Sequence, residues 1–358
     1  MNAPFLGLRP RVRLADLAQT DERRRYAAFL SEHLQTSAFH APEWLDAVAE
    51  GTGNRAHLLL IEGAGGIAAA LPLSEIHSPV FGRLLASTGF AVGGGLLARE
   101  GVDATPLFAA AEELALRLSC PAIELRGGHL PEGRDGWRIR SDAHCGFVAS
   151  LAENDEAQLL AIPRKQRAEV RKGLDAALSV SVGRGEADRA AHYAVYAESV
   201  RNLGTPVFPR ALFDAVMDRF GDNADILTVR HGEEPVASVL SLYHRGAVMP
   251  YWGGGTRAAR PLRANDRMYF ELMLHARRRG CDSFDFGRSK TGSGAFHFKR
   301  NWGFAPEPLT YATWTAPGQP VRDADPTSAK HAALIAAWQR LPLALANRIG
   351  PLIARGLG

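Results

Sequence analysis

The sequence predicts a mixed α/β (α+β) fold in two similar domains, followed by a short helical tail. Short apolar runs alternate with stretches of helical periodicity, and no sustained heptad pattern indicates a coiled coil. The chain has 358 residues, of which 46% are hydrophobic, and this is enough for two cores of ordinary size. A motif that occurs twice is the third observation.

The repeated motif reads strand, glycine-rich loop, helix, strand. The triple glycines 93–95 and 253–255 each close an apolar run. An acidic residue between apolar neighbours follows at nearly the same distance, Glu124 in the first copy and Asp285 in the second. An apolar stripe predicts a helix in each copy, with Leu107, Ala111, Leu114 and Leu118 in the first and Phe270, Met273 and Leu274 in the second. Chance similarity is the alternative explanation.

A tandem duplication explains this repeat and sets the domain boundary near residue 155, in the polar stretch 152–156. We expect an N-terminal domain over 1–155, a C-terminal domain over 156–325 and a tail over 326–358. In the second domain, the runs 224–229 and 236–243 flank a polar turn, which predicts a β-hairpin. A hairpin, a strand with a glycine-rich end and a helix is also the order of elements in the core of a GNAT-type acyltransferase, which is an analogy at the level of the fold.

Composition restricts the class of protein. The net charge of +4 and the pI near 9.1 allow anionic ligands without requiring nucleic acid. Cys120, Cys145 and Cys281 are isolated and have no metal-ligand spacing, so we expect neither a disulfide framework nor a metal site. The first 25 residues contain no apolar export segment, which predicts a cytoplasmic protein.

Two groups of cations are candidate phosphate-binding sites. The segment PRKQRAEVRKG places Arg164, Arg167 and Arg171 on one helical face, with Lys165 and Lys172 beside them. A solvated helix is the alternative for this first group. The second group follows Gly255 at the start of a predicted helix, where free N–H groups favour a pyrophosphate or phosphodiester, and a surface role is its alternative. It consists of Arg257, Arg260, Arg263 and Arg267.

The segment DFGRSKTGSGAFHFKRNWG carries the candidate catalytic residues. It places Lys299 between Phe298 and Trp302, after a strand that ends at Asp285. A lysine held rigidly by aromatic rings can stabilise the oxyanion that forms when an amine attacks an acyl carbonyl. The alternative is that Lys299 caps the loop and pairs with Asp285. The same segment lacks the lysine of a P-loop and is not a GxSxG elbow, and His297 is more typical of a packed residue than of a base.

The motifs RNLGTPVFPRALF, YWGGG and NDRMYFELMLHARRRGCDSFDFGRSKTGSGAFHFKRNWG closely resemble FemAB-like proteins associated with exosortase and PEP-CTERM systems. The likeness covers nearly the whole chain. It implies two tandem GNAT-like domains, acyl or aminoacyl transfer to an amine, and a link to exopolysaccharide or cell-envelope synthesis. By position, Lys299 matches a lysine near the reacting acyl group, and Asp285 and Arg288 lie at the end of the DFG-like strand.

The two cationic groups supply expected substrate-binding residues: Arg164, Lys165, Arg167 and Arg171 from the first, and Arg257, Arg260 and Arg263 from the second. The segment PRKQRAEVRKG also resembles the family's basic helix, which matches Arg164, Lys165 and Arg167. The remaining candidates in the matched motifs are Asn202, Tyr251, Trp252, Arg288, Phe298 and Trp302.

The acyl donor is expected to be a co-substrate, either acyl-CoA or aminoacyl-tRNA, and no tightly bound cofactor is expected. Two departures from the resemblance bear on this choice. No helical-hairpin arm interrupts the second domain, which counts against tRNA as donor and against nucleic acid as partner. The loop 257–262 lacks the glycines of the usual pyrophosphate loop, which counts against standard acetyl-CoA binding.

The tail from 330 to 358 is basic and amphipathic. It carries Lys330, Arg340, Arg348 and Arg355 and no acidic residue, and Pro342 and Pro351 are expected to break it into short helices. Such a tail fits an anionic membrane surface, at the inner face of the plasma membrane. Packing onto the body of the protein is the alternative.

These observations favour an N-acyltransferase, of enzyme class EC 2.3, that acts on an amine of a saccharide or lipid-linked precursor. The first domain, without the added cations, is expected to be scaffold and acceptor wall. Two alternatives remain open at this point: an aminoacyl-tRNA-dependent transferase of the peptidoglycan type, and a non-catalytic adaptor that binds saccharide phosphates.

Overall fold

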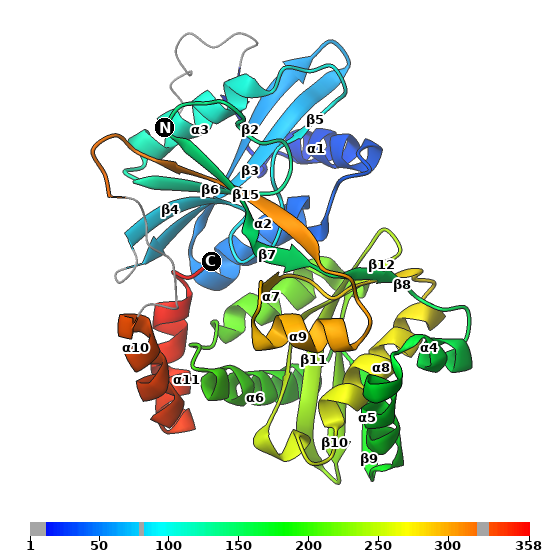
Figure 1. Cartoon of the computed structure of the whole chain (residues 1–358). Coiled ribbons are helices and arrows are strands. Elements are labelled where there is room, and N and C mark those ends of the chain that lie inside the picture. The colour runs from blue at the N-terminus through cyan, green and yellow to red at the C-terminus, as the bar shows by residue number, and fades with distance from the viewer. Residues whose placement is uncertain (1–11, 79–81, 321–328) are drawn as a thin grey trace. The chain divides into compact units, whose positions relative to one another are not determined.

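The computed structural model of the chain describes residues 12–78, 82–320 and 329–358 (Figure 1). The chain forms two compact units. The first consists of Met1–Ser141, Leu309–Asp325 and Leu352–Gly358, and the second of Asp142–Pro308 and Pro326–Pro351. The units therefore divide the chain before residue 155 and distribute the tail between them, whereas the sequence analysis placed the tail outside both domains.

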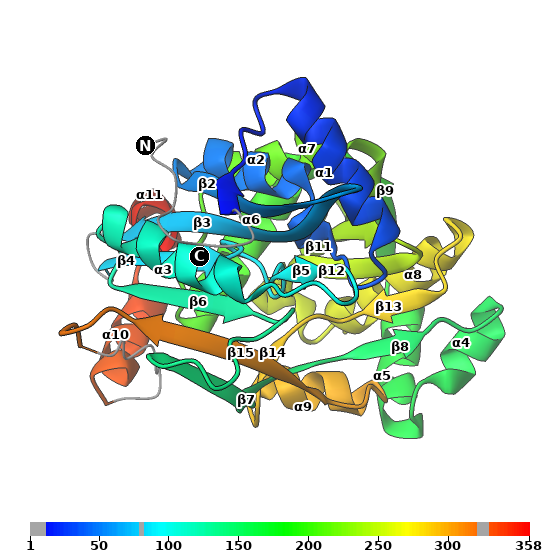
Figure 2. The same ribbon diagram turned by 90° about the horizontal axis from the view of Figure 1, so that it is seen from above.

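The first unit is built on one mixed sheet, in which α3 packs against the strands (Figure 2). Its strands pair in the order β1 (Val12–Leu14), β2 (Arg55–Gly63), β3 (Gly66–Ser78), β4 (Gly82–Ser87), β6 (Ala122–Arg126), β15 (Glu307–Thr315) and β7 (Trp137–Gly146), and β5 (Leu97–Ala98) pairs with β3. Its helices are α1 (Thr20–Glu32), η1 (Ala38–His40), α2 (Pro42–Thr52) and α3 (Thr105–Arg117).

The second unit contains a six-stranded sheet with helices on both faces. The strands follow the order β8 (Val148–Ser150), β13 (Ser283–Asp285), β12 (Ala247–Gly255), β11 (Glu234–His244), β10 (Ala224–His231) and β9 (Leu178–Gly183), and β14 (Ser289–Lys290) pairs with residues 144–145. The helices are α4 (Asp155–Ala161), α5 (Arg164–Asp175), α6 (Glu186–Leu203), α7 (Arg210–Phe220), η2 (Gly221–Asn223), η3 (Arg257–Ala259), α8 (Ala264–Arg278), α9 (Gly294–Asn301), α10 (Ala329–Arg340) and α11 (Leu343–Ala354).

The repeat predicted from the sequence is confirmed in its order of elements. In the first unit, β4, the loop with glycines 93–95, α3 and β6 follow one another, and in the second β12, α8 and β13 do so. In both units the two strands of the repeat pair in parallel, whereas their other described pairings are antiparallel. The predicted hairpin is also confirmed, as β10 and β11.

The two copies differ at the ends of their parallel strands. In the first unit, the backbone of Leu96 bridges to Gly128 and accepts a 3.0 Å hydrogen bond from the His129 N–H. A Cβ added to Gly95 would lie 1.9 Å from the Gly127 carbonyl oxygen, so the two chain segments are in direct contact. In the second unit, β12 and β13 pair only through Ala247 with Ser283 and Val248 with Phe284. The first unit is therefore closed at the point where the strands of the second separate.

The glycines at the end of β12 are required by helix packing. A Cβ on Gly254 would lie 2.2 Å from the Ser199 Oγ on α6, and one on Gly255 would lie 2.4 Å from the Asn265 Oδ1 at the start of α8. A Cβ on Gly253 would meet Val239 at 2.9 Å. Because alternate residues of a strand face opposite sides of the sheet, this glycine run lets α6 and α8 approach β12 from both faces.

The tail helix α10 packs on α6 within the second unit. Ile335 lies against Gly204, the Arg201 guanidinium donates to the Gln339 carbonyl at 3.1 Å, and the Gln339 amide donates to the Asn202 carbonyl at 3.2 Å. Packing onto the body, the alternative held for the tail, therefore applies to α10. The side chain of Lys330 lies outside the described residues.

Pro342 separates α10 from α11 as predicted, but the break predicted at Pro351 is wrong. Pro351 lies inside α11, close to its end at Ala354. A proline so near the end of a helix removes only one of its last hydrogen bonds, so the helix continues. None of the described helices has both the length and the apolar character needed to cross a membrane.

The glycine packing is tested by Gly254→Ala. We expect it to lower the free energy of unfolding by about 1–3 kcal/mol, because the new methyl group overlaps both Cβ and Oγ of Ser199. In the Ser199→Gly background the same change should cost clearly less. Gly294→Ala, where the new methyl meets nothing within 4 Å, is the control. Equal costs of Gly254→Ala in both backgrounds, measured by urea denaturation, would contradict the packing argument.

Candidate functional site

The separation of β12 from β13 defines the candidate site in the second unit. After Asp285 the chain leaves β12, and the Phe286 N–H donates to the Phe147 carbonyl at 2.8 Å. Over 249–255, β12 has no strand partner on its β13 side within the part of the chain that the structure describes. Backbone N–H and C=O groups at such an edge need partners, and a ligand with amide groups can supply them. In open sheets, ligands bind beyond the carboxyl ends of parallel strands.

Tyr251 is the additional residue of a β-bulge on this edge. The register of β11 with β12 shifts so that Leu240 faces Trp252 and Ser241 faces Pro250. Bulges re-aim side chains and are frequent beside active sites. Trp252 is buried and its ring lies 4.7 Å from that of Phe213 on α7, whereas Tyr251 is half-buried. Of these two predicted substrate-binding residues, Trp252 thus packs toward α7 and Tyr251 is the more accessible.

Four aromatic side chains form a cluster at the carboxyl ends of β12 and β13. The Tyr269 ring lies 4.8 Å from Phe286, 5.8 Å from Phe298 and 6.2 Å from Trp302, measured between ring centroids. Burial raises the pKa of Tyr269 to about 12, so its hydroxyl stays protonated at neutral pH. The Trp302 Nε1 is buried and lacks a hydrogen-bond partner among the described residues. The cluster therefore contains two N–H or O–H donors that a ligand could use.

Lys299 lies beneath this loop and is 8% exposed. Its Nζ donates to the carbonyls of Gly287 and Arg288, both at 3.0 Å, and lies 5.4 Å and 5.6 Å from the ring centroids of Phe147 and Phe286. Loss of hydration lowers the pKa of Lys299 to about 8, although the carboxylate of Asp285 opposes this change. Lys299 thus caps the loop, which was one of the two alternatives. An ammonium has three donors, so one remains for an oxyanion, and that role stays a prediction.

Asp285 is positioned by the same loop. Its Oδ1 accepts a hydrogen bond from the Gly287 N–H at 2.8 Å. Burial raises the pKa of Asp285, while this backbone bond and the charge of Lys299 act in the opposite direction. A carboxylate with a raised pKa is a better proton acceptor than an exposed one, so the site contains a candidate base beside its candidate cation.

The two cationic groups predicted separately are neighbours in the second unit, because α5 lies along the start of α8 (Figure 1). The Gln166 amide donates to the Asp266 carboxylate at 2.6 Å, and the Arg263 Nε lies 2.6 Å from the Glu169 carboxylate. Arg167 donates to the carbonyls of Ile162 and Leu160 at the end of α4. Arg263 and Arg167 therefore have partners within the protein. Arg263 is nevertheless exposed, as are the candidates Arg164, Lys165, Arg171, Arg257 and Arg260 on these elements.

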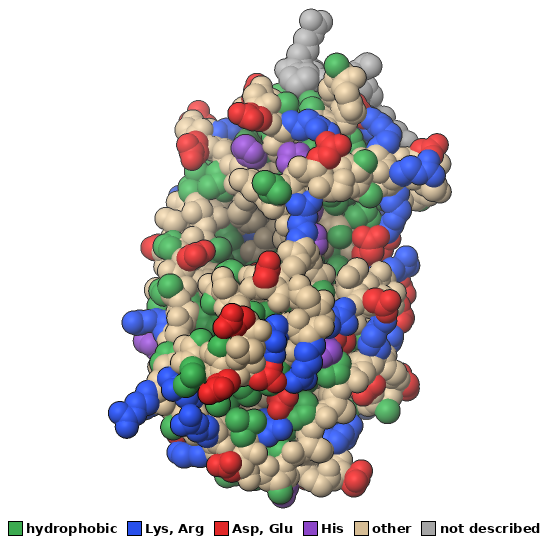
Figure 3. Space-filling view, turned by 90° about the vertical axis from the view of Figure 1, so that its right-hand side faces the viewer, with side chains coloured by type: hydrophobic (Ala, Val, Ile, Leu, Met, Phe, Trp, Pro, Cys, Tyr) green, Lys and Arg blue, Asp and Glu red, His purple; other side chains and the backbone are tan. Residues whose placement is uncertain are grey.

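The charge on this side of the molecule is mixed. Figure 3 shows Lys and Arg side chains interspersed with Asp and Glu in its lower half. This view does not show the uniformly basic surface that is typical of proteins that bind nucleic acid. Among the described residues, no group of three His, Cys, Asp or Glu side chains is placed to hold a metal ion.

Asn202 is linked to the loop that follows β12 by Glu198, a residue that the sequence patterns did not indicate. The Glu198 Oε1 accepts a 2.9 Å hydrogen bond from the Arg257 N–H, and the Asn202 amide lies 3.5 Å from the same oxygen. Neither Glu198 nor Tyr269 forms part of a pattern of charge or spacing that indicates a binding site. The one sequence feature that could have indicated Tyr269 is its place in the motif NDRMYFELM, four residues after Asn265 at the helix start.

Comparison with protein families supports the fold of the second unit. Residues 164–300, which extend from α5 to α9, match the model of the acetyltransferase (GNAT) domain. The chain has no match to a curated protein sequence at the significance required.

Solved structures share the fold over most of the chain. FemX has a TM-score of 0.62 at 14% identity and is similar over 81% of this chain and 95% of its own. A tandem GNAT protein from the clavulanic acid biosynthesis pathway has a TM-score of 0.57 at 14% identity, over 87% and 99%. L-PGS from Bacillus licheniformis has a TM-score of 0.53 at 13% identity, over 88% and 96%. At these identities the likeness shows the fold, and the predicted mixed architecture of two tandem GNAT-like domains is confirmed.

The state of Lys299 is tested by a pH titration of its ammonium group by NMR. We expect the midpoint near pH 8, because burial disfavours the charged form, with the ammonium present below and the neutral amine above that pH. The resonance is identified by its loss in Lys299→Met. A midpoint near the ordinary lysine value would show that Lys299 is hydrated.

Proposed function

We propose that the chain is an N-acyltransferase that binds its acyl donor along the unpaired edge of β12 and transfers the acyl group to an amine. The separation of β12 from β13 carries this proposal, because it leaves strand-edge amides of β12 without a strand partner in the unit that also holds the buried Lys299 and the half-buried Asp285. The match of 164–300 to an acetyltransferase domain supports acyl transfer as the class of reaction.

The transfer forms one C–N bond and breaks one bond from the acyl carbon to sulfur or oxygen. The amine nitrogen attacks the carbonyl carbon, and the carbonyl oxygen becomes an oxyanion. The third N–H of Lys299, whose other two hold the Gly287 and Arg288 carbonyls, donates to this oxyanion. Collapse of the intermediate expels a thiolate or alkoxide, which takes up the proton released by the amine.

Only a weak base is needed for the proton of the attacking amine. An α-amine has a pKa of about 8 and is partly neutral at physiological pH. Asp285, whose burial raises its pKa, is the candidate acceptor for the remaining fraction, and a phosphate of the substrate is the alternative acceptor.

We further propose a chemical class for the acceptor. The resemblance to FemAB-like proteins of exosortase and PEP-CTERM systems supports an amine on a saccharide or lipid-linked precursor of the cell envelope. The exposed cations Arg164, Lys165, Arg171, Arg257 and Arg260 would bind the phosphates of the donor or of such a precursor. Mass spectrometry of the extracellular polysaccharide, with and without the gene, would identify both the acyl group and the acceptor.

Two measurements identify the acyl donor and distinguish an acyltransferase from a non-catalytic adaptor. An acyltransferase releases free thiol or deacylated tRNA in step with product, whereas an adaptor binds saccharide phosphate and consumes no donor. Aminoacyl-tRNA as donor requires binding that weakens steeply with salt. The acids among the cations of α5 and α8, such as Glu169 and Asp266, count against that donor.

The role of Lys299 is tested by Lys299→Ala in an assay with the donor identified in this way. We expect turnover to fall about 10²–10³-fold, because an oxyanion donor is lost. Arg24→Ala is the control, since Arg24 is exposed, pairs with Asp21 on the surface of α1 and belongs to neither cationic group. The loop must remain folded for this comparison, which circular dichroism and thermal unfolding would check. Undiminished turnover in a folded Lys299→Ala protein would refute the assignment.

A further inference from the structure

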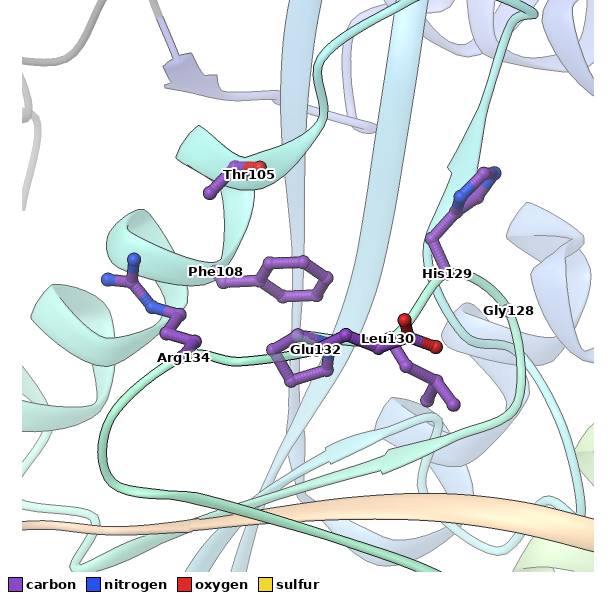
Figure 4. A pocket seen from close by; sticks show the side chains of 8 residues that line it. Thr105, Phe108, Gly128, His129, Leu130, Glu132 and Arg134 are labelled. Atoms are coloured by element: carbon purple, nitrogen blue, oxygen red, sulfur yellow. The ribbon is translucent and has the colours of Figure 1, made fainter.

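The first unit has a hollow of its own, outside the site described above. It has a volume of about 440 Å³ and lies between the start of α3 and the loop that follows β6 (Figure 4). Its lining comprises Thr105 and Phe108 of α3 and residues Gly128, His129, Leu130, Pro131, Glu132 and Arg134 of the loop. The volume is in the range of small-molecule binding sites.

The apolar part of the lining is small and well supported. Phe108 is 4% exposed, and its ring makes an edge contact with Trp137 at 5.9 Å. The indole N–H of Trp137 donates to Glu112 at 2.6 Å, and the Arg134 guanidinium donates to both oxygens of the same carboxylate at 2.7 Å and 2.8 Å. Figure 4 shows Phe108 directed toward the loop and Arg134 extending away from it. The positive charge of Arg134 is therefore neutralised by Glu112.

The rim of the hollow is polar. His129, Glu132 and Thr105 are exposed, and the Thr105 hydroxyl and N–H both bond to Asp103. The carboxylate of Glu132 accepts hydrogen bonds, the imidazole of His129 can donate and accept, and the Thr105 hydroxyl retains lone pairs. The lining offers carboxylate and neutral polar groups, while its one guanidinium is paired. An anionic ligand would meet the carboxylate of Glu132, and the one guanidinium of the lining is already paired with Glu112.

The position of the hollow follows from the repeat. It lies past the carboxyl end of β6, beside the start of α3, and these elements correspond to β13 and α8 in the second unit. The close contact of Gly95 with Gly127 closes the strand ends in the first unit, and the hollow lies outside this contact, between the loop and the helix.

We propose that this hollow binds an uncharged sugar ring. Its hydroxyls would hydrogen-bond to Glu132, His129 and Thr105, and its C–H groups would pack on Leu130 and on the small exposed parts of Phe108 and Pro131. Such a ring has a circle of hydroxyls that both donate and accept, which matches a lining that is mostly polar with a small apolar part. The proposal does not depend on acyl transfer in the second unit.

The test is a titration of the full chain with D-glucose, N-acetyl-D-glucosamine and D-glucose 6-phosphate. Saturation-transfer NMR monitors the binding of each sugar. We expect the neutral sugars to bind at millimolar concentrations and the phosphorylated sugar to bind more weakly, because the carboxylate of Glu132 repels it. Glu132→Gln and His129→Ala should each weaken binding by about tenfold, as expected for a hydrogen bond to a charged or strongly polar group. Asp21→Asn, an exposed carboxylate of α1 that does not line the hollow, should leave binding unchanged.

Each other outcome overturns the proposal. If none of the three sugars bound, the hollow would not be a sugar site. If Glu132→Gln, His129→Ala and Asp21→Asn all bound as the wild type does, the sugar would bind elsewhere. If glucose 6-phosphate bound more tightly than glucose, the ligand class would be wrong. Glu132 and His129 are exposed, so both variants should fold, and thermal unfolding would verify this.

Discussion

The separation of β12 from β13 is the constraint on which the second unit depends. Lys299 maintains it by holding the carbonyls of Gly287 and Arg288, which fixes the loop where the chain leaves the sheet. Burying this ammonium is unfavourable, since a pKa of about 8 instead of 10.5 corresponds to about 3 kcal/mol. The rings of Phe147 and Phe286, whose centroids lie 5.4 Å and 5.6 Å from the Nζ, attract the ammonium and offset part of this cost, so that a desolvated cation lies against the loop that follows β13.

The two copies of the repeat use the same elements differently. In the first unit the backbone contact of Gly95 with Gly127 closes the strand ends, and Arg126 is buried among the carbonyls of Thr88, Ala91 and Gly358. In the second unit the corresponding place is open and is bordered by cations and aromatic rings. The two units thus share an order of elements, and the contacts at their strand ends determine which of them has an accessible edge.

The sequence was sufficient for the parts of the fold that local patterns determine. The apolar stripes predicted α3 and α8, the turn at 231–235 predicted the hairpin, and the repeat predicted two related parallel pairs. The sequence was insufficient where contacts between elements determine the position of a side chain. The pairing of Arg263 with Glu169 and the contact of Glu198 with the Arg257 N–H join segments that are far apart in the sequence. The bond from Arg167 to the end of α4 depends on how the chain turns between α4 and α5, which the spacing of residues does not reveal. Pro351 was overestimated as a helix breaker because its place near the end of α11 was unknown.

The central claim, that the donor binds along the free edge of β12, is tested most directly by hydrogen–deuterium exchange. The exchange of amides 249–255 would be followed with acetyl-CoA and with aminoacyl-tRNA added in turn, alongside the amides of β10 as an internal reference. The account predicts that the true donor slows exchange at 249–255 and leaves β10 unchanged. A donor that is consumed by the protein but protects only segments outside the second unit would contradict it.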